Sequence, residues 1–194
     1  MEQNFDEYNI EQTEQSQPQS KGSGFLKELL SWIKAILTAA VIAYVVQNFV
    51  IVNAMVPTGS MENTIMSNDR VIAFRLSYLF NDPSRFDIIV FRNPDNPDLL
   101  YIKRIIGMPG ETIMITGGNV YIDGEELVED AQFIKEEFFG TFGPFTAGDG
   151  EFFVLGDNRN RSEDSRAWDN PFVPEDLIVG RAVFKYFRGF EVFR

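Results

Sequence analysis

The longest apolar stretch of the chain lies near its N-terminal end. From Ala35 to Val52 the sequence AILTAAVIAYVVQNFVIV contains no charged residue for 18 positions, which approaches the length that an α-helix needs to cross a hydrocarbon layer. The pattern therefore predicts one transmembrane helix over residues 33–54. A buried helix of a soluble domain is the alternative, because Gln47 and Asn48 interrupt the apolar run.

The chain before this stretch is polar and acidic. Five acidic residues precede the first basic one, Lys21: Glu2, Asp6, Glu7, Glu11 and Glu14. This composition is typical of disorder, so residues 1–32 are predicted to form a disordered acidic tail. A cleaved signal peptide fits less well, because it begins with a short basic region, although Val52-Asn53-Ala54 has the small residues of a cleavage site.

Lysines are distributed unevenly around the apolar run. Lys21, Lys27 and Lys34 precede it, whereas the first basic residue after it is Arg70. Because basic residues are enriched on the cytoplasmic side of a membrane, we expect the tail in the cytoplasm and residues 55–194 outside the cell membrane.

The rest of the chain alternates short apolar runs with turn-forming pairs such as Asn-Asp, Pro-Gly and Asp-Gly. Seven strands are predicted, at residues 70–74, 87–91, 101–106, 112–115, 120–122, 152–155 and 182–187. Strands at this spacing indicate a mostly β fold, an antiparallel β-sheet sandwich or barrel. Asp123-Gly124 is predicted to form the tight turn of a hairpin.

Composition limits the chemistry that this domain can perform. The 194 residues include no histidine and no cysteine, and the net charge is −12. A histidine-dependent serine triad, a disulfide and nearly every zinc, copper or haem site are therefore excluded. We expect no metal and no cofactor, and the negative charge argues against binding to nucleic acid.

Two residues remain as candidates for nucleophilic catalysis. Ser60 lies in the turn-forming run 56–61, and Lys103 lies in the predicted strand 101–106. A serine hydroxyl needs a base to take its proton, and lysine is the base that this composition leaves. Strand alternation places Lys103 between Tyr101 and Ile105, where desolvation would lower its pKa. An ordinary turn serine and an edge-strand lysine are the alternatives.

A third polar segment follows the predicted strand 152–155. The run GDNRNRSEDSR at residues 156–166 combines acidic, amide, hydroxyl and guanidinium side chains, which can pair with one another and with the backbone in a rigid loop. A solvated charged loop is the alternative.

These segments together resemble a known family. PTGSMENTI, SRFDIIVF, YIKRIIGMPGE and GDNRNRSEDSR occur in the same order as the boxes of bacterial type I signal peptidase, the membrane-anchored Ser/Lys leader peptidase, with the apolar anchor ahead of them. The resemblance extends from the anchor to about residue 187. It implies a membrane-bound serine endopeptidase that cleaves signal peptides from secretory preproteins, with membrane lipid as its other partner.

The resemblance also implies roles for individual residues. Ser60 is the nucleophile and Lys103 its general base, Thr58 completes the oxyanion hole, and Ser162 orients the lysine. Asp164 with Arg166, and Asp157 with Arg104, are supporting charged residues. The apolar subsites for the substrate map onto Val56, Pro57, Met61, Ile65, Tyr101 and Ile102.

Two features depart from the family pattern. Met61-Glu62-Asn63-Thr64-Ile65 replaces the commoner Met-x-Pro-Thr-Leu, so that a proline is lost and an acid is gained. Residues 116–150, where some members insert a large domain, leave room for a small cap.

Two rival hypotheses belong to other classes. One is a self-cleaving cytosolic repressor with a Ser/Lys pair, which the anchor and the lack of a helix-turn-helix pattern disfavour. The other is a membrane-anchored peptide-binding homologue without activity, which the presence of both Ser60 and Lys103 disfavours.

Overall fold

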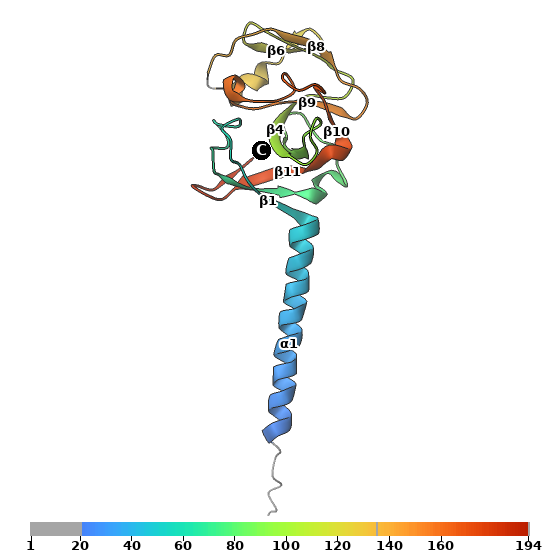
Figure 1. The fold of residues 1–194 in the computed structure, drawn as a ribbon, viewed down its shortest axis with the longest axis vertical. Helices are drawn as coiled ribbons and strands as arrows, with labels where there is room; N and C mark the ends of the chain where they lie inside the picture. The colour runs from blue at the N-terminus through green and yellow to red at the C-terminus, as the bar shows by residue number, and fades with distance from the viewer. Residues whose placement is uncertain (1–20, 135, 194) are drawn as a thin grey trace, which may run out of the picture. The chain divides into compact units, whose positions relative to one another are not determined.

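The chain divides into two compact units, Met1–Ile42 and Ala43–Arg194. The computed structural model describes residues 21–134 and 136–193, without the side chains of residues 21–23, 129 and 130 (Figure 1). Residues 1–20 of the predicted tail lie outside this range.

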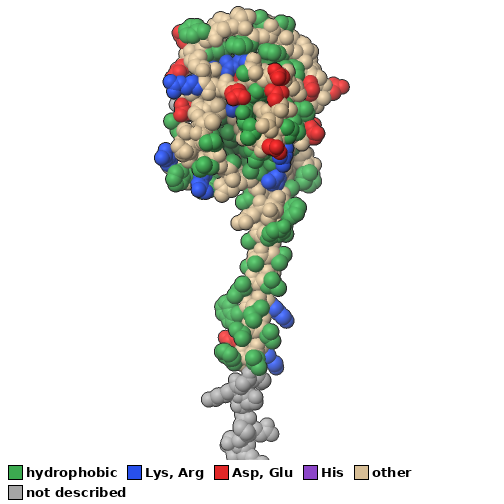
Figure 2. Space-filling view, viewed as in Figure 1, with side chains coloured by type: hydrophobic (Ala, Val, Ile, Leu, Met, Phe, Trp, Pro, Cys, Tyr) green, Lys and Arg blue, Asp and Glu red, His purple; other side chains and the backbone are tan. Residues whose placement is uncertain are grey.

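The N-terminal apolar stretch forms helix α1 (Lys21–Val45), followed by a π-helical turn, η1 (Val46–Val50). Figure 2 shows apolar side chains along this helix, with charged ones near its N-terminal end. By length and composition alone, the segment Gly24–Val50 could cross a membrane. The helix begins twelve residues before the predicted position, because residues 21–32 contain helix formers and no proline. It also ends earlier, since Ile51–Met55 is a strand.

Within the described residues, the larger of two antiparallel sheets has eight strands in the order β1-β2-β11-β3-β4-β9-β10, with β12 paired to β11. Its strands are β1 (Ile51–Met55), β2 (Arg70–Phe74), β3 (Ile88–Arg92), β4 (Leu100–Gly107), β9 (Glu151–Leu155), β10 (Val173–Pro174), β11 (Ile178–Lys185) and β12 (Glu191–Val192). Strand β4 thus lies inside the sheet, between β3 and β9.

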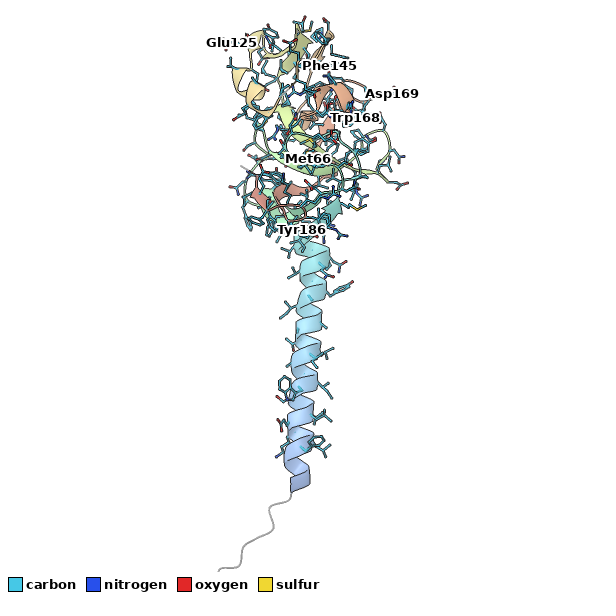
Figure 3. The ribbon with its side chains drawn as sticks, turned by 90° about the vertical axis from the view of Figure 1, so that its left-hand side faces the viewer. Met66, Glu125, Phe145, Trp168, Asp169 and Tyr186 are labelled. Atoms are coloured by element: carbon cyan, nitrogen blue, oxygen red, sulfur yellow. The ribbon has the colours of Figure 1, made fainter. Side chains whose placement is uncertain are left out.

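The smaller sheet has the order β7-β6-β5-β8. It consists of β5 (Thr112–Thr116), β6 (Asn119–Ile122), β7 (Glu125–Glu126) and β8 (Phe142–Thr146). Asp123 and Gly124 join β6 to β7 with φ values of 51° and 89°, which are the positive values of the expected tight turn. In Figure 3, Glu125 and Phe145 of this sheet lie at the end of the domain opposite Tyr186. Residues 116–150 therefore contribute most of a sheet, which is more than a small cap.

Short 3-10 turns connect the strands. They are η2 (Arg75–Tyr78), η3 (Val128–Phe133), η4 (Arg159–Arg161) and η5 (Glu175–Leu177).

The prediction of a mostly antiparallel β fold is confirmed. All seven predicted strands are present, and β11 begins four residues earlier than expected. Five strands were not predicted. Strand β1 continues the apolar run of the helix, so its sequence alone shows no boundary, and β7, β10 and β12 have only two residues each. Strand β8 contains Gly143 and Pro144, which are unfavourable in strands.

Alternate residues of β3 pack into different parts of the core. Ile88 and Val90 join a cluster with β1 and β2 residues, whereas Ile89 and Phe91 join a cluster with β9 residues. A strand buried on both faces has a continuous apolar sequence, as Ile88–Phe91 does. A third cluster joins the two sheets through Ile106, Ile113, Ile115, Val120, Phe138, Phe153 and Leu155.

Gly107 allows close packing at this junction of the sheets. A Cβ atom added there would lie 2.6 Å from Ile113 Cδ1 and 2.9 Å from Phe153 Cβ. We therefore expect Gly107→Ala to destabilise the protein by about 1–3 kcal/mol through overpacking. Chemical unfolding of the detergent-solubilised protein measures this change. Gly148→Ala is the control, because its Cβ would meet only the flexible end of Glu151, and an equal loss in both variants would contradict the assignment.

Candidate active site

Ser60 lies in a tight turn that follows β1. The backbone N–H of Glu62 donates to the Gly59 carbonyl at 3.1 Å, and the N–H of Ile65 donates to the Met61 carbonyl at 2.8 Å. Met61 and Ile65 are fully buried and anchor the turn in the core. These contacts fix Ser60, of which only 5% is exposed, beside strand β4.

Lys103 reaches Ser60 from the middle of β4. Its Nζ donates to Ser60 Oγ at 2.8 Å and to the Ile102 carbonyl at 3.2 Å. The Tyr101 ring centroid lies 5.3 Å from the same Nζ. Only 4% of Lys103 is exposed, so the ammonium has few opportunities to bind water.

Burial lowers the pKa of Lys103 to about 8. Desolvation is the largest cause, because a buried site disfavours the charged form. The carboxylates of Asp164, Glu163 and Asp157 oppose this shift, and Arg166 adds to it. A substantial fraction of Lys103 is therefore neutral in mildly alkaline solution and able to accept a proton.

Thr58 and Ser162 both lie near Ser60. Thr58 Oγ1 is 3.4 Å from Ser60 Oγ. Ser162 lies near the Ser60 backbone, since a Cβ built on Gly156 would be 2.3 Å from both Ser162 Oγ and the Ser60 carbonyl oxygen. Ser162 Oγ is buried and has no hydrogen-bond partner among the described residues. The bond to Lys103 that the resemblance implies is thus not formed in this structure.

The four supporting charged residues form two buried ion pairs. Arg104 donates to Asp157 from Nε at 2.9 Å and from Nη2 at 2.7 Å. Arg166 donates in the same bidentate way to Asp164, with both distances 2.8 Å. Asp164 also accepts from the Gly156 N–H at 3.1 Å. The predicted polar loop is therefore held by paired side chains rather than solvated.

A groove of about 570 Å³ opens beside Ser60 and Lys103. Four of the six predicted subsite residues line it, namely Val56, Pro57, Tyr101 and Ile102. Met61 and Ile65 do not line the groove and are corrected to core residues, because the turn directs them inward. The groove also includes residues that were not predicted: Val52, Asn53, Ala54, Met55, Val90, Leu99, Leu100, Arg161 and Glu163.

Asn158 contacts the Ser60 turn, and the sequence analysis did not single it out. Its backbone N–H donates to the Ser60 carbonyl at 3.1 Å, and its Nδ2 donates to the Gly59 carbonyl at 3.0 Å. The available signal was its position beside Asp157 in the polar run. Because Gly59 and Asn158 are separated by 99 positions in the sequence, no local pattern pairs them.

The site offers a candidate nucleophile, Ser60, and a candidate base, Lys103. Within residues 21–134 and 136–193, no cluster of three histidine, cysteine, aspartate or glutamate side chains could hold a metal ion. Such a site can perform covalent acyl transfer, because a buried serine hydroxyl is hydrogen-bonded to a lysine with a lowered pKa.

Comparison with known proteins places the chain in a family of peptidases. The family described as "Signal peptidase, peptidase S26" matches residues 29–187. The chain therefore belongs to this family and is a serine peptidase.

Several relatives match over most of the chain. A signal peptidase I from Leptolyngbya laminosa is 40% identical over 182 residues, which cover 90% of this chain and 88% of the relative. A signal peptidase I from Bacillus licheniformis is 32% identical and covers 87% of this chain and 94% of its own. A solved signal peptidase I from Enterococcus faecalis is 34% identical, with a TM-score of 0.43, over 52% of this chain and 97% of that one.

The backbone at Asn63 accounts for one departure from the family motif. Asn63 occupies the position of the commoner proline and has φ of 100°, whereas proline is restricted to about −65°. We expect Asn63→Pro to destabilise the turn by about 1–3 kcal/mol and to lower the turnover rate. Glycine tolerates positive φ, so Asn63→Gly should retain both properties.

Thermal unfolding and initial cleavage rates of the two variants test this interpretation. Equal stability and activity of Asn63→Pro and wild type would show that the turn does not require the positive φ.

Proposed function

We propose that this chain is a membrane-bound endopeptidase that removes N-terminal signal peptides from exported preproteins, with Ser60 as nucleophile and Lys103 as general base. The observation that carries the proposal is the 2.8 Å contact from Lys103 Nζ to Ser60 Oγ at a buried site that lowers the lysine pKa. Membership of the signal peptidase family supports the substrate class.

Neutral Lys103 starts the reaction by taking the Ser60 proton while Oγ attacks the carbonyl carbon of the scissile peptide bond. The tetrahedral intermediate collapses to an ester on Ser60, and the lysine ammonium gives its proton to the leaving amine. Neutral Lys103 then takes a proton from water, which attacks the ester carbonyl carbon. When this second intermediate collapses, the lysine ammonium returns the proton to Ser60 Oγ, and the signal peptide leaves with a new carboxyl group.

Thr58 is proposed to stabilise the negative oxygen of the intermediate. Its hydroxyl lies 3.4 Å from Ser60 Oγ and borders the groove, so a carbonyl carbon bonded to Oγ would place its oxygen near this donor. The Ser60 N–H is the second proposed donor. Donors fixed before the reaction lower the barrier because no solvent must reorient.

The groove fits an extended peptide. Its walls come from β1 and the following turn on one side and from β4 on the other, so peptide groups of the substrate could pair with exposed backbone. Val56, Pro57, Tyr101 and Ile102 are the proposed apolar subsites. We propose that they accept small side chains of the substrate near the cut.

The buried ion pairs are proposed to position the catalytic residues. Asp157 pairs with the neighbour of Lys103 on β4, and Asp164 accepts from Gly156, which contacts the Ser60 turn. Ser162 is proposed to orient Lys103 when substrate completes the site, because its buried hydroxyl lies next to the Ser60 backbone.

The proposed topology has the tail in the cytoplasm, the helix across the membrane and the catalytic unit outside. The lysine asymmetry around the apolar stretch supports this orientation.

Cleavage should depend on pH through Lys103. Its pKa is lowered to about 8, so the base is protonated and inactive below this value. We expect kcat/KM to fall about tenfold per pH unit on the acid side and to level off above about pH 8. Lys103→Arg should be inactive at every pH, because guanidinium does not deprotonate. A folded Lys103→Arg enzyme that cleaves at the wild-type rate would remove Lys103 from the mechanism.

The function is tested with purified full-length protein in detergent and a secretory precursor that carries its signal peptide. Wild type should release the mature protein with a single new N-terminus, and Ser60→Ala should release none while unfolding at the same temperature. Intact precursor with wild type, or equal cleavage by Ser60→Ala, would refute the proposal.

A further inference from the structure

The segment around Ser162 presents two charged side chains to the groove. Ser162 has φ of −116° and ψ of 126°, which is an extended conformation. In an extended segment, neighbouring side chains point to opposite sides and alternate ones to the same side. Ser162 Oγ is accordingly buried, whereas Arg161 and Glu163 are exposed and line the groove.

Glu163 is held against the groove wall by a residue of β4. The Tyr101 hydroxyl donates to Glu163 Oε1 at 3.5 Å, and Tyr101 lies two residues before Lys103. A residue rises about 3.3 Å along a strand, so this anchor is only two strand positions from the base. The carboxylate therefore lies close to where the scissile bond would bind.

Glu163 differs from the other acids near Lys103 in having no cationic partner. Asp164 is paired with Arg166, and Asp157 is paired with Arg104. Among the described residues, Glu163 forms no salt bridge, and its side-chain contact is the neutral Tyr101 hydroxyl. Arg161 likewise has no ion pair within the described part of the chain. Besides Lys103, the groove thus presents one carboxylate and one guanidinium to its ligand, and neither belongs to an ion pair among the described residues.

We propose that Glu163 is a specificity-determining residue, which favours preproteins with a lysine or arginine within about three positions of the cleaved bond. The inference rests on the proposed function and adds a charge preference to the selection of small side chains. Arg161, on the same side of the segment, favours an acidic side chain at a neighbouring substrate position.

The size of the effect follows from the exposure of the groove. A partly exposed ion pair contributes modestly, and the same carboxylate repels an acidic side chain by a comparable amount. Substrates with lysine and with glutamate at the facing position should therefore differ in kcat/KM by roughly 3- to 20-fold. Because salt shortens the range of such interactions to about 3 Å at 1 M, the ratio should shrink in concentrated salt.

The test uses the full-length enzyme in detergent and one precursor peptide in which each position from three before to three after the cut is glutamine, lysine or glutamate. Wild type should prefer lysine over glutamate at one position. Glu163→Gln keeps an acceptor for Tyr101 and should abolish the preference, and Glu163→Lys should reverse it. Arg161→Gln should alter the preference at a different position, toward basic residues.

Glu125→Gln is the matched control, because it removes the same charge from an exposed residue at the far end of the domain (Figure 3). It should leave every ratio unchanged. Glu163→Gln should also move the acid limb of kcat/KM to lower pH, since Glu163 raises the pKa of Lys103 together with Asp164 and Asp157, against Arg166. A purely structural role would not move this limb.

The outcomes separate this inference from the proposed function. If wild type leaves the glutamine series uncut, the proposed function itself fails. If wild type cuts that series but shows the same charge preference as Glu163→Gln, or if Glu125→Gln changes the ratios equally, the role of Glu163 is overturned.

Discussion

Burial of the Lys103 amine is the constraint on which the rest of the site depends. An amine in water keeps its proton and cannot act as a base near neutral pH, whereas a buried amine gives it up more readily. Such burial requires a strand with neighbours on both sides, and β4 has β3 on one side and β9 on the other. It also requires a partner for the amine, which the Ser60 hydroxyl supplies at 2.8 Å. The proposed chemistry therefore requires the contact between the Ser60 turn and β4, in which Ser60 and Lys103 are 43 residues apart in the sequence.

Two adjacent residues of β4, Lys103 and Arg104, are both buried cations, but the protein accommodates their charges in different ways. Among the described residues, no carboxylate forms a salt bridge with Lys103, and its pKa falls. Arg104, in contrast, is held by both oxygens of Asp157. An unpaired buried guanidinium would be costly because arginine cannot lose its proton. Strand alternation directs these two side chains to opposite faces of the sheet. The rigid Arg104 pair and the neutralisable Lys103 thus coexist one residue apart, and the first fixes the strand that carries the second.

The sequence was informative where one local pattern determines the outcome. The central strands follow from apolar runs between turns, and the Asp123-Gly124 hairpin follows from its turn chemistry. The predicted end of the helix was wrong because the helix and β1 are both apolar. Ile51–Met55 is a strand because it pairs with β2, which its own sequence does not reveal. Met61 and Ile65 were misplaced for a related reason, since an apolar side chain after the nucleophile suits a subsite or the core equally. The contact from Asn158 to the Ser60 turn joins distant segments and is visible only in the fold.

The charges around Lys103 indicate how a bound peptide could change the pKa of this residue. The carboxylates of Asp164 and Asp157 raise the pKa of Lys103, but each is committed to an arginine by a bidentate contact. Their effect on the pKa of Lys103 is therefore set by the folded structure. Glu163 acts on the same amine from the groove wall, where a bound peptide can remove water from it or place a charge beside it. A cationic substrate side chain there would reduce the amount by which Glu163 raises the pKa of Lys103. In the proposed mechanism, the groove would thus link recognition of a substrate to the protonation state of Lys103, the proposed base.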